Sequence, residues 1–355
     1  MDHNILKTLE KGDFILGEKV FELEKKLAEY VGVKECITCA SGTDALQIPL
    51  MANNIGPGDV VFTTNFSFFA TAEVISLVGA KPIFVDVDND TFNIDYQLLE
   101  QKIISILKEK KYIPKAIIAV DLFGQLANYD KIEEIAKKFD LILIEDAAQS
   151  FGASYKGKKS CSFGDVAATS FYPAKPLGCY GDGGAIFTNN SELAQKMRSI
   201  RVHGEGKDKY DNIRVGLNSR LDTIQSVVLI EKMKIFDEEI KLRNKVADYY
   251  NENLDQFVKI PKIAYKNISS WAQYSILVNQ KDRDKLIKHL QKFHIPIAVF
   301  YKKPFNTLDL YFENRDLDFS ISLMLSQSIL SLPMHPYLVK RDLDKIIKAI
   351  KDFYE

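Results

Sequence analysis

The chain has 355 residues, of which 46% are hydrophobic and 27% are charged, as is typical of a soluble globular protein. This length allows two domains, or one large domain with an appendage. The 47 basic and 48 acidic residues nearly cancel, so no basic field indicates binding to nucleic acid or to an anionic membrane. No stretch is apolar enough for a signal peptide or a membrane span, and we expect a cytoplasmic protein.

The first two thirds of the chain alternate between predicted strands and predicted helices. Apolar residues recur at helical spacing over 17–31, with Val20, Leu23 and Leu27 on one stripe. Short apolar runs predict strands at 36–40, 60–63, 82–86, 116–120, 141–145, 167–171 and 185–188, and helices are predicted at 70–78, 96–108 and 130–138. This alternation predicts an α/β fold with a mostly parallel central sheet flanked by helices. Ligands of such sheets bind beyond the carboxyl ends of the strands.

The pattern changes after Arg220, where apolar residues at helical spacing continue to about Tyr250. We interpret this segment as a long helix that leads into a smaller C-terminal α+β domain. Strands are predicted there at 274–278 and 296–301, and helices at 284–293 and 341–353. The expected division is a large α/β domain over 1–235 and a small domain over 236–355.

A single lysine stands in an apolar, glycine-rich stretch that follows a short predicted strand. Lys175 lies between two prolines and is the only charged residue between Asp165 and Asp182. Burial lowers the pKa of a lysine because it disfavours the ammonium form, and the neutral amine can then attack a carbonyl carbon. For this stretch alone, a loop lysine that extends to solvent is the alternative.

Two further features lie at the ends of predicted strands. The turn Ser-Gly-Thr-Asp-Ala at 41–45 opens a helix, where backbone N–H groups and the helix dipole can bind a phosphate; a plain helix cap is the alternative. Asp146 ends an apolar strand, where a carboxylate either caps the next helix or faces a ligand. A phosphate cradle, a carboxylate for a ring nitrogen and a buried lysine are what pyridoxal 5'-phosphate needs. The sequence therefore predicts this cofactor.

Other motifs are excluded. Of the four cysteines only Cys36 and Cys39 form a C-x2-C pair, so we interpret all four as structural thiols. The stretch 152–159 nearly matches a phosphate-binding P-loop, but Lys159 stands where Ser or Thr must reach magnesium, and we expect a surface hairpin there. The five histidines have no metal-ligand spacing, and we predict no metal site.

Motifs spread along the chain resemble those of the sugar aminotransferase family of the DegT/DnrJ/EryC1/StrS type. They lie at 15–17, 41–46, 68–73, 145–150, 170–184, 203–204, 216–222 and 332–337. Members of this family are pyridoxal-phosphate enzymes of fold type I, the aspartate-aminotransferase-like fold, and act on nucleotide-linked keto sugars. The resemblance therefore implies this fold and a transaminase activity.

The resemblance also implies which residues hold the cofactor ring. Lys175 matches the catalytic lysine that bonds to the aldehyde, and Asp146 matches the partner of the pyridine nitrogen. Gln149 matches the residue near the ring hydroxyl, and Phe68 the aromatic residue that stacks on the ring. In such enzymes the freed lysine then moves the proton between the amino acid and the cofactor.

The cofactor phosphate is implied to lie between two subunits. Gly42, Thr43 and Ser170 match residues that bind it from the same chain. Asn218 matches a residue that reaches it from the neighbouring subunit. The resemblance therefore implies a homodimer with both active sites at the subunit interface.

Within the family, the chain is most similar to the enzymes that act on UDP-2-acetamido-2-deoxy-3-keto-glucuronate, through the runs 150–158, 175–184 and 218–223. This similarity implies amino transfer from L-glutamate to C3 of that sugar, in the synthesis of surface polysaccharides such as the O-antigen of lipopolysaccharide. Arg220, Tyr301 and His335 are the implied substrate-binding residues. Those enzymes typically have His-Tyr where this chain has Phe300-Tyr301, which leaves the identity of the sugar open.

The residues leave three alternatives to this activity. In the first, the amino group goes to C3 or C4 of a dTDP- or UDP-linked (di)deoxy keto sugar. Related sugar dehydratases carry histidine at the position of Lys175, which argues against dehydration. A non-catalytic regulatory or nucleotide-binding protein on the same scaffold would have degenerate cofactor residues, whereas all the matched ones are present.

Overall fold

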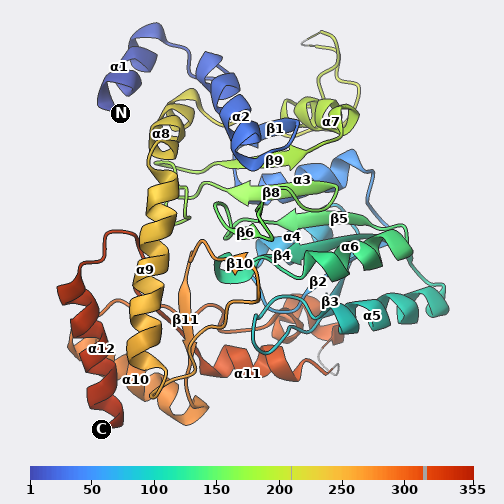
Figure 1. Cartoon of the computed structure of the whole chain (residues 1–355). Coiled ribbons are helices and arrows are strands. Elements are labelled where there is room, and N and C mark those ends of the chain that lie inside the picture. Colours follow the sequence, from blue (N-terminus) through green and yellow to red (C-terminus); the bar gives the residue numbers. More distant parts are fainter. Residues whose placement is uncertain (209, 315–317) are drawn as a thin grey trace.

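The computed structural model describes residues 1–208, 210–314 and 318–355, and a seven-stranded sheet forms its centre (Figure 1). In spatial order its strands are β1 (Glu35–Cys39), β9 (Gly184–Thr188), β8 (Val166–Ser170), β5 (Ile142–Asp146), β4 (Ile113–Val120), β2 (Asp59–Thr64) and β3 (Lys81–Val85). Strand β9 is antiparallel to both of its neighbours, and the other pairs are parallel. The predicted mostly parallel sheet is confirmed.

Helices cover both faces of this sheet (Figure 1). One face packs against α3 (Gly42–Ala52), α4 (Ala70–Leu77) and α7 (Ser191–Arg201). The other packs against α2 (Glu18–Val31), α5 (Tyr96–Glu109), α6 (Tyr129–Lys138) and α8 (Thr223–Met233). An additional N-terminal helix, α1 (Asp2–Lys11), contacts α8 and was not predicted.

Adjacent residues of each strand enter different cores, because side chains alternate across a sheet. In β4, Ile118 packs with the α3 side and Ile117 with the α5 side, and both are fully buried. Burial on both faces explains the continuous apolar runs that predicted these strands. All four cysteines are buried and free, which confirms their interpretation as structural thiols.

Several chain segments leave the sheet at one edge. Strand β1 is parallel to β8, because each is antiparallel to β9. The carboxyl ends of β1, β5 and β8 therefore lie at the same edge, and they end at Cys39, Asp146 and Ser170. The predicted turn after 40, the predicted carboxylate and the lysine loop all emerge there.

The C-terminal part begins with α9 (Phe236–Leu254) and has its own core, formed by residues between 246 and 350. Its other elements are β11 (Tyr274–Leu277), α10 (Gln280–Lys292), α11 (Ser320–Ser328), β12 (Ile329–Leu332) and α12 (Lys340–Tyr354), with 3-10 turns at Phe305–Thr307 and Asp309–Asn314. The domain boundary at 235/236 stays a prediction. No helix of the described ranges is long and apolar enough to cross a membrane.

Two expectations for this part were wrong. The single long helix from Arg220 is two helices, α8 and α9, because Ile235 has a non-helical backbone (φ −117°, ψ 0°). The start of α9 still packs in the same core as α8, through Phe236 and Ile240, and the C-terminal core begins at Val246. The segment 296–301 is not a strand, since it pairs only through Ala298 with Ser331. Strand β12, which was not predicted, pairs with β11 instead.

A small sheet lies beside the central one. Strands β6 (Ser154–Tyr155) and β7 (Lys158–Lys159) form a hairpin, and β10 (Asn267–Ile268) pairs with β6. Lys156 and Gly157 at the tip both have positive φ, as a tight hairpin turn requires. The expected surface hairpin is confirmed at the stretch that nearly matches a P-loop.

Candidate active site

A pocket of about 540 Å³ opens at the carboxyl edge of the central sheet. Eight of the residues singled out from the sequence line it: Gly42, Thr43, Phe68, Asp146, Gln149, Ser170, Lys175 and Tyr301. They come from five separate parts of the chain. The structure therefore brings the predicted lysine, carboxylate and phosphate turn into one cavity.

Asp146 presents its carboxylate from the last position of β5 and is 4% exposed. Its Oδ2 accepts a hydrogen bond from the Thr71 hydroxyl (2.8 Å), and its Oδ1 accepts one from the Ala148 N–H (3.2 Å). Burial raises the pKa of this carboxyl, while these two donors and the charge of Lys175 lower it. A cation beside Asp146 would keep the carboxylate ionised in spite of its burial.

Lys175 lies in the loop between β8 and β9, and its backbone N–H donates to the carbonyl of Tyr172 (2.8 Å). The residue is half-buried. Burial lowers the pKa of its amine below the ordinary value for lysine, and the negative charge of Asp146 opposes this shift. The neutral fraction of this amine is available as a nucleophile or a base.

The turn that begins α3 has the geometry of an anion site. Ser41 caps the helix, with its Oγ accepting from the Asp44 N–H (3.1 Å). A Cβ on Gly42 would lie 2.6 Å from the Cβ of Ser170, so only glycine lets the two segments approach this closely. The close approach places the Ser170 side chain beside the free N–H groups of the first helical turn, and these groups attract a phosphate.

Aromatic rings and an amide form another wall. Phe68 is 56% exposed although it lines the pocket, and its ring lies 6.4 Å from the ring of Tyr301. The Gln149 Nε2 donates to the Tyr301 hydroxyl (3.0 Å), and its Oε1 accepts from the Phe123 N–H (2.7 Å). The amide of Gln149 is thus held in place, and in the same pocket the exposed ring of Phe68 is free to stack on a flat ligand.

These observations fit pyridoxal phosphate. The phosphate would bind at the α3 turn with Ser170, and the ring would stack on Phe68. Asp146 would face the ring nitrogen, whose positive charge would offset the burial of the carboxylate. Lys175 would face the aldehyde. Each polar group of the cofactor has a chemically matched residue in the pocket.

Three predicted residues do not line the pocket of this chain. Asn218 is exposed and Arg220 half-exposed on a loop that is tied to α3, because the intervening Ser219 donates its hydroxyl to Asp44 (2.6 Å). His335 lies at the surface of the C-terminal part, where partial desolvation of its ring and the nearby charge of Arg243 lower its pKa. By contrast, Phe300 does line the pocket.

Other residues of the pocket were not singled out from the sequence. Thr71 bonds to Asp146, and Asp182 and Gln273 also line the pocket. Thr71 lies three residues after Phe68 within the motif at 68–73, and its N–H donates to the Phe68 carbonyl (3.2 Å), so this motif marks its position. Gln273 enters the pocket from the C-terminal part through tertiary packing, and no local pattern marks it.

A sequence profile of the DegT/DnrJ/EryC1/StrS aminotransferase family matches residues 1–351. The chain belongs to this family. The UDP-2-acetamido-2-deoxy-3-oxo-D-glucuronate aminotransferase of Pseudomonas aeruginosa is 48% identical over 351 residues, which are 99% of this chain and 95% of that protein. The match runs end to end, so the similarity covers both the pocket and the C-terminal part.

Solved structures agree with the fold of this aminotransferase. A family member from Brucella abortus superposes with a TM-score of 0.97 at 51% identity, covering 99% of this chain and 94% of that one. The Bacillus subtilis protein NtdA, solved with the bound cofactor PMP, superposes with a TM-score of 0.90 at 29% identity, covering 99% and 81%. The protein is a pyridoxal-phosphate-dependent aminotransferase of fold type I.

Proposed function

We propose that the enzyme transfers the amino group of L-glutamate to C3 of UDP-2-acetamido-2-deoxy-3-oxo-D-glucuronate, in the synthesis of a surface polysaccharide. The observation that carries the chemistry is the half-buried Lys175, with its lowered pKa, in one pocket with Asp146. The end-to-end identity of 48% to the P. aeruginosa enzyme supports the choice of sugar. A cytoplasmic location stays a prediction.

In this proposal Lys175 has two tasks. Its neutral amine would hold the cofactor covalently, and the same amine would be free to act as a base when glutamate is bound in its place. Because its pKa is lowered, a larger fraction of the amine is unprotonated near neutral pH and able to accept the Cα proton of glutamate. The Lys175 amine would then deliver that proton to the bound cofactor, and the same amine would carry out the reverse proton transfer when the keto sugar is aminated.

Bound pyridoxal phosphate supplies the aldehyde that accepts the amino group and a ring that accepts an electron pair. Asp146 would hold the ring nitrogen protonated, which strengthens that acceptance. Thr71 and Ala148 direct the carboxylate of Asp146 through their hydrogen bonds. Gln149, fixed by Phe123 and Tyr301, would bond to the ring hydroxyl.

The charge of the pocket supports a homodimer. Among the lining residues that the structure describes, Lys175 is the only lysine, arginine or histidine, whereas Asp146 and Asp182 are acidic. The proposed substrate carries a pyrophosphate and a carboxylate, which guanidinium groups bind well. Arg220 is partly exposed on a loop outside the pocket, from where it can serve the active site of a second copy.

A hybrid dimer tests this sharing. Lys175→Ala and Arg220→Ala subunits carry different tags and are co-expressed, and the doubly tagged dimer is purified. We expect each parent dimer to be nearly inactive and the hybrid to regain about half of wild-type activity, because one of its two sites holds both native residues. An inactive hybrid would place Arg220 in the site of its own chain.

A substrate panel tests the sugar. Initial rates with L-glutamate are compared for UDP-2-acetamido-2-deoxy-3-oxo-D-glucuronate and for dTDP- and UDP-linked deoxy keto sugars that lack the carboxylate. We expect kcat/KM to be lower by about 100-fold or more for the deoxy sugars, because polar groups that bind the carboxylate would be left without a partner. A preference for a dTDP-linked deoxy sugar would contradict the proposed substrate.

A further inference from the structure

Two carboxyl groups that the proposed reaction does not use lie in contact at the carboxyl ends of β4 and β5. Asp121 directly follows β4, Glu145 precedes Asp146 in β5, and both side chains are fully buried. Their carboxyl groups hydrogen-bond to each other. Because side chains alternate across a strand, Glu145 and Asp146 point to opposite faces of the sheet. The pair therefore lies behind the strand that presents Asp146 to the pocket.

The hydrogen bonds around this pair require a proton on one of the two groups. Every hydrogen bond that the described residues donate to the pair comes from a neutral group. The donors are the Ala127 N–H (3.0 Å), the Tyr129 hydroxyl (2.9 Å) and the Ser150 hydroxyl (2.7 Å) for Asp121, and the N–H groups of Cys161 (2.7 Å) and Phe163 (2.9 Å) for Glu145. Ionised carboxylates only accept, so two of them cannot bond to each other, and in contact they repel.

The titratable groups around the pair favour the same proton. Burial raises the pKa of Asp121 and of Glu145 more than their donors lower it. Tyr129 on α6 and Cys161 after β7 face the pair, and burial raises the pKa of both, so they are neutral near pH 7. Nearby Asp146 adds only negative charge. The folded protein therefore retains one proton between the two carboxyl groups at neutral pH.

Both ends of the segment that carries Asp146 and Gln149 are tied to this pair. Glu145 directly precedes Asp146 in the chain. Ser150 directly follows Gln149, and its hydroxyl donates to Asp121 (2.7 Å). The backbone N–H of Asp121 also donates to the carbonyl of Asp146 (3.1 Å). The two groups that would face the cofactor ring thus lie on a segment that the acid pair holds at both ends.

Asp121 also closes the turn that holds the amide of Gln149. Its Oδ1 accepts from the Ala127 N–H (3.0 Å), which ties together the two ends of the segment 121–127. Within this segment the Phe123 N–H donates to the Oε1 of Gln149 (2.7 Å). A change at Asp121 would therefore reach Gln149 through Phe123 as well as through the residue that follows Gln149.

We propose that Asp121 and Glu145 hold one proton between them, and that the resulting bond makes them positioning residues for Asp146 and Gln149. With the proton, the two carboxyl groups bond to each other; without it, two charges in contact would force β4 and β5 apart at the edge that carries the site. This inference rests on the proposed roles of Asp146 and Gln149, and it adds the groups that hold them in place.

The proton has a spectroscopic signature that does not depend on activity. The infrared carbonyl band of a protonated carboxyl group is recorded near neutral pH for the wild-type holoenzyme and for Asp121→Asn. We expect the band in the wild type and its loss in Asp121→Asn, because Glu145 then ionises and accepts from the new amide. A wild type without the band would overturn the proposal, and so would a band that survives in Asp121→Asn.

Rescue by the amide tests the positioning role. Asp121→Asn keeps one oxygen for the donors of its loop and offers an N–H to Glu145, while the hydroxyl of Ser150 can turn to that of Ser160 (2.6 Å). Asp121→Ala provides none of these bonds. The readouts are the circular dichroism of the bound cofactor and the rate constant of its spectral change with L-glutamate.

We expect both readouts of Asp121→Asn to resemble the wild type, with the rate constant within about threefold. In Asp121→Ala the cofactor dichroism should change and the rate constant fall by about 10- to 100-fold, because small misplacements of reacting groups are costly. Asp121→Ser replaces Asp121→Ala if that variant does not fold. Equal dichroism and rate in the wild type and the folded variant without the carboxyl group would overturn the positioning role.

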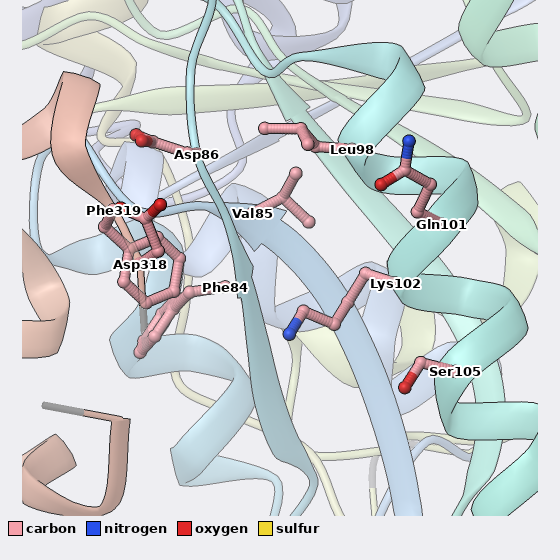
Figure 2. A pocket seen from close by; sticks show the side chains of 9 residues that line it. All are labelled: Phe84, Val85, Asp86, Leu98, Gln101, Lys102, Ser105, Asp318 and Phe319. Carbon is pink, nitrogen blue, oxygen red and sulfur yellow. The ribbon is translucent and has the colours of Figure 1, made fainter. Parts of the chain in front are cut away.

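A matched control is a buried aspartate that follows another strand. Asp86 follows β3 and lines the pocket shown in Figure 2. Its carboxylate accepts from the N–H groups of Ile321 (2.9 Å) and Ser322 (2.9 Å) at the start of α11 rather than from a second carboxyl group. Asp86→Asn should leave the infrared band in place. If the wild type does not respond to L-glutamate, the proposed function fails, whereas the infrared band still tests the pair.

Discussion

Replacing Lys175 by alanine is expected to abolish amino transfer while the protein stays folded and retains cofactor. The side chain is half-buried at the pocket wall, and its amine is the group in the described lining that can both bond to an aldehyde and move a proton. A proton-transferring residue contributes about 100- to 10,000-fold, and loss of covalent activation adds to this. We expect kcat to fall by at least about 1,000-fold.

Two measurements distinguish lost chemistry from lost folding. Borohydride should fix the cofactor covalently to wild-type protein and not to Lys175→Ala, while both bind added pyridoxal phosphate and show equal thermal unfolding without it. Lys348→Ala on the exposed face of α12 is the matched control and should keep full activity. Turnover at the wild-type rate by purified Lys175→Ala would contradict the assignment.

The central sheet was predictable from the sequence because its strands are buried on both faces. Their apolar runs, such as 116–120, are bounded by turns and contrast with the amphipathic helices between them. The elements that carry the site residues were predictable from local sequence as well. Ser41 begins a helix, Asp146 ends a strand, and an isolated lysine follows a third strand. Parallel strands place all three at one edge.

The C-terminal part was less predictable because its contacts are tertiary. The apolar segment 296–301 has the composition of a strand, but it bonds to β12 at a single pair, and the aromatic residues at its end line the pocket instead. A break at Ile235 separates two helices that have continuous helical periodicity. Gln273 reaches the pocket from this part of the chain, and its neighbours in sequence carry no signal of that role.

Asp146→Asn is expected to reduce kcat by about 1,000-fold with little effect on the fold, because an amide cannot hold the ring nitrogen protonated. The asparagine can still accept from the Ala148 N–H, so the end of β5 keeps its geometry. Bound cofactor should remain, with an altered absorbance spectrum. Asp140→Asn, at an exposed position with positive φ that asparagine tolerates well, is the matched control.

The same substitution should change how stability depends on pH. Burial raises the pKa of Asp146 in the cofactor-free protein, so the folded state holds this proton more tightly than the unfolded state. Stability therefore falls as pH rises from about 4 through the raised pKa, and this contribution is absent from Asp146→Asn. Unfolding temperatures of the cofactor-free wild type and variant at pH 5 and pH 8 measure this contribution.

We expect the variant to gain stability relative to the wild type as pH rises. Saturating cofactor should remove that gain, because a cation beside Asp146 favours its charged form. A variant that loses stability equally at both pH values would show that Asp146 is needed for packing rather than for its charge.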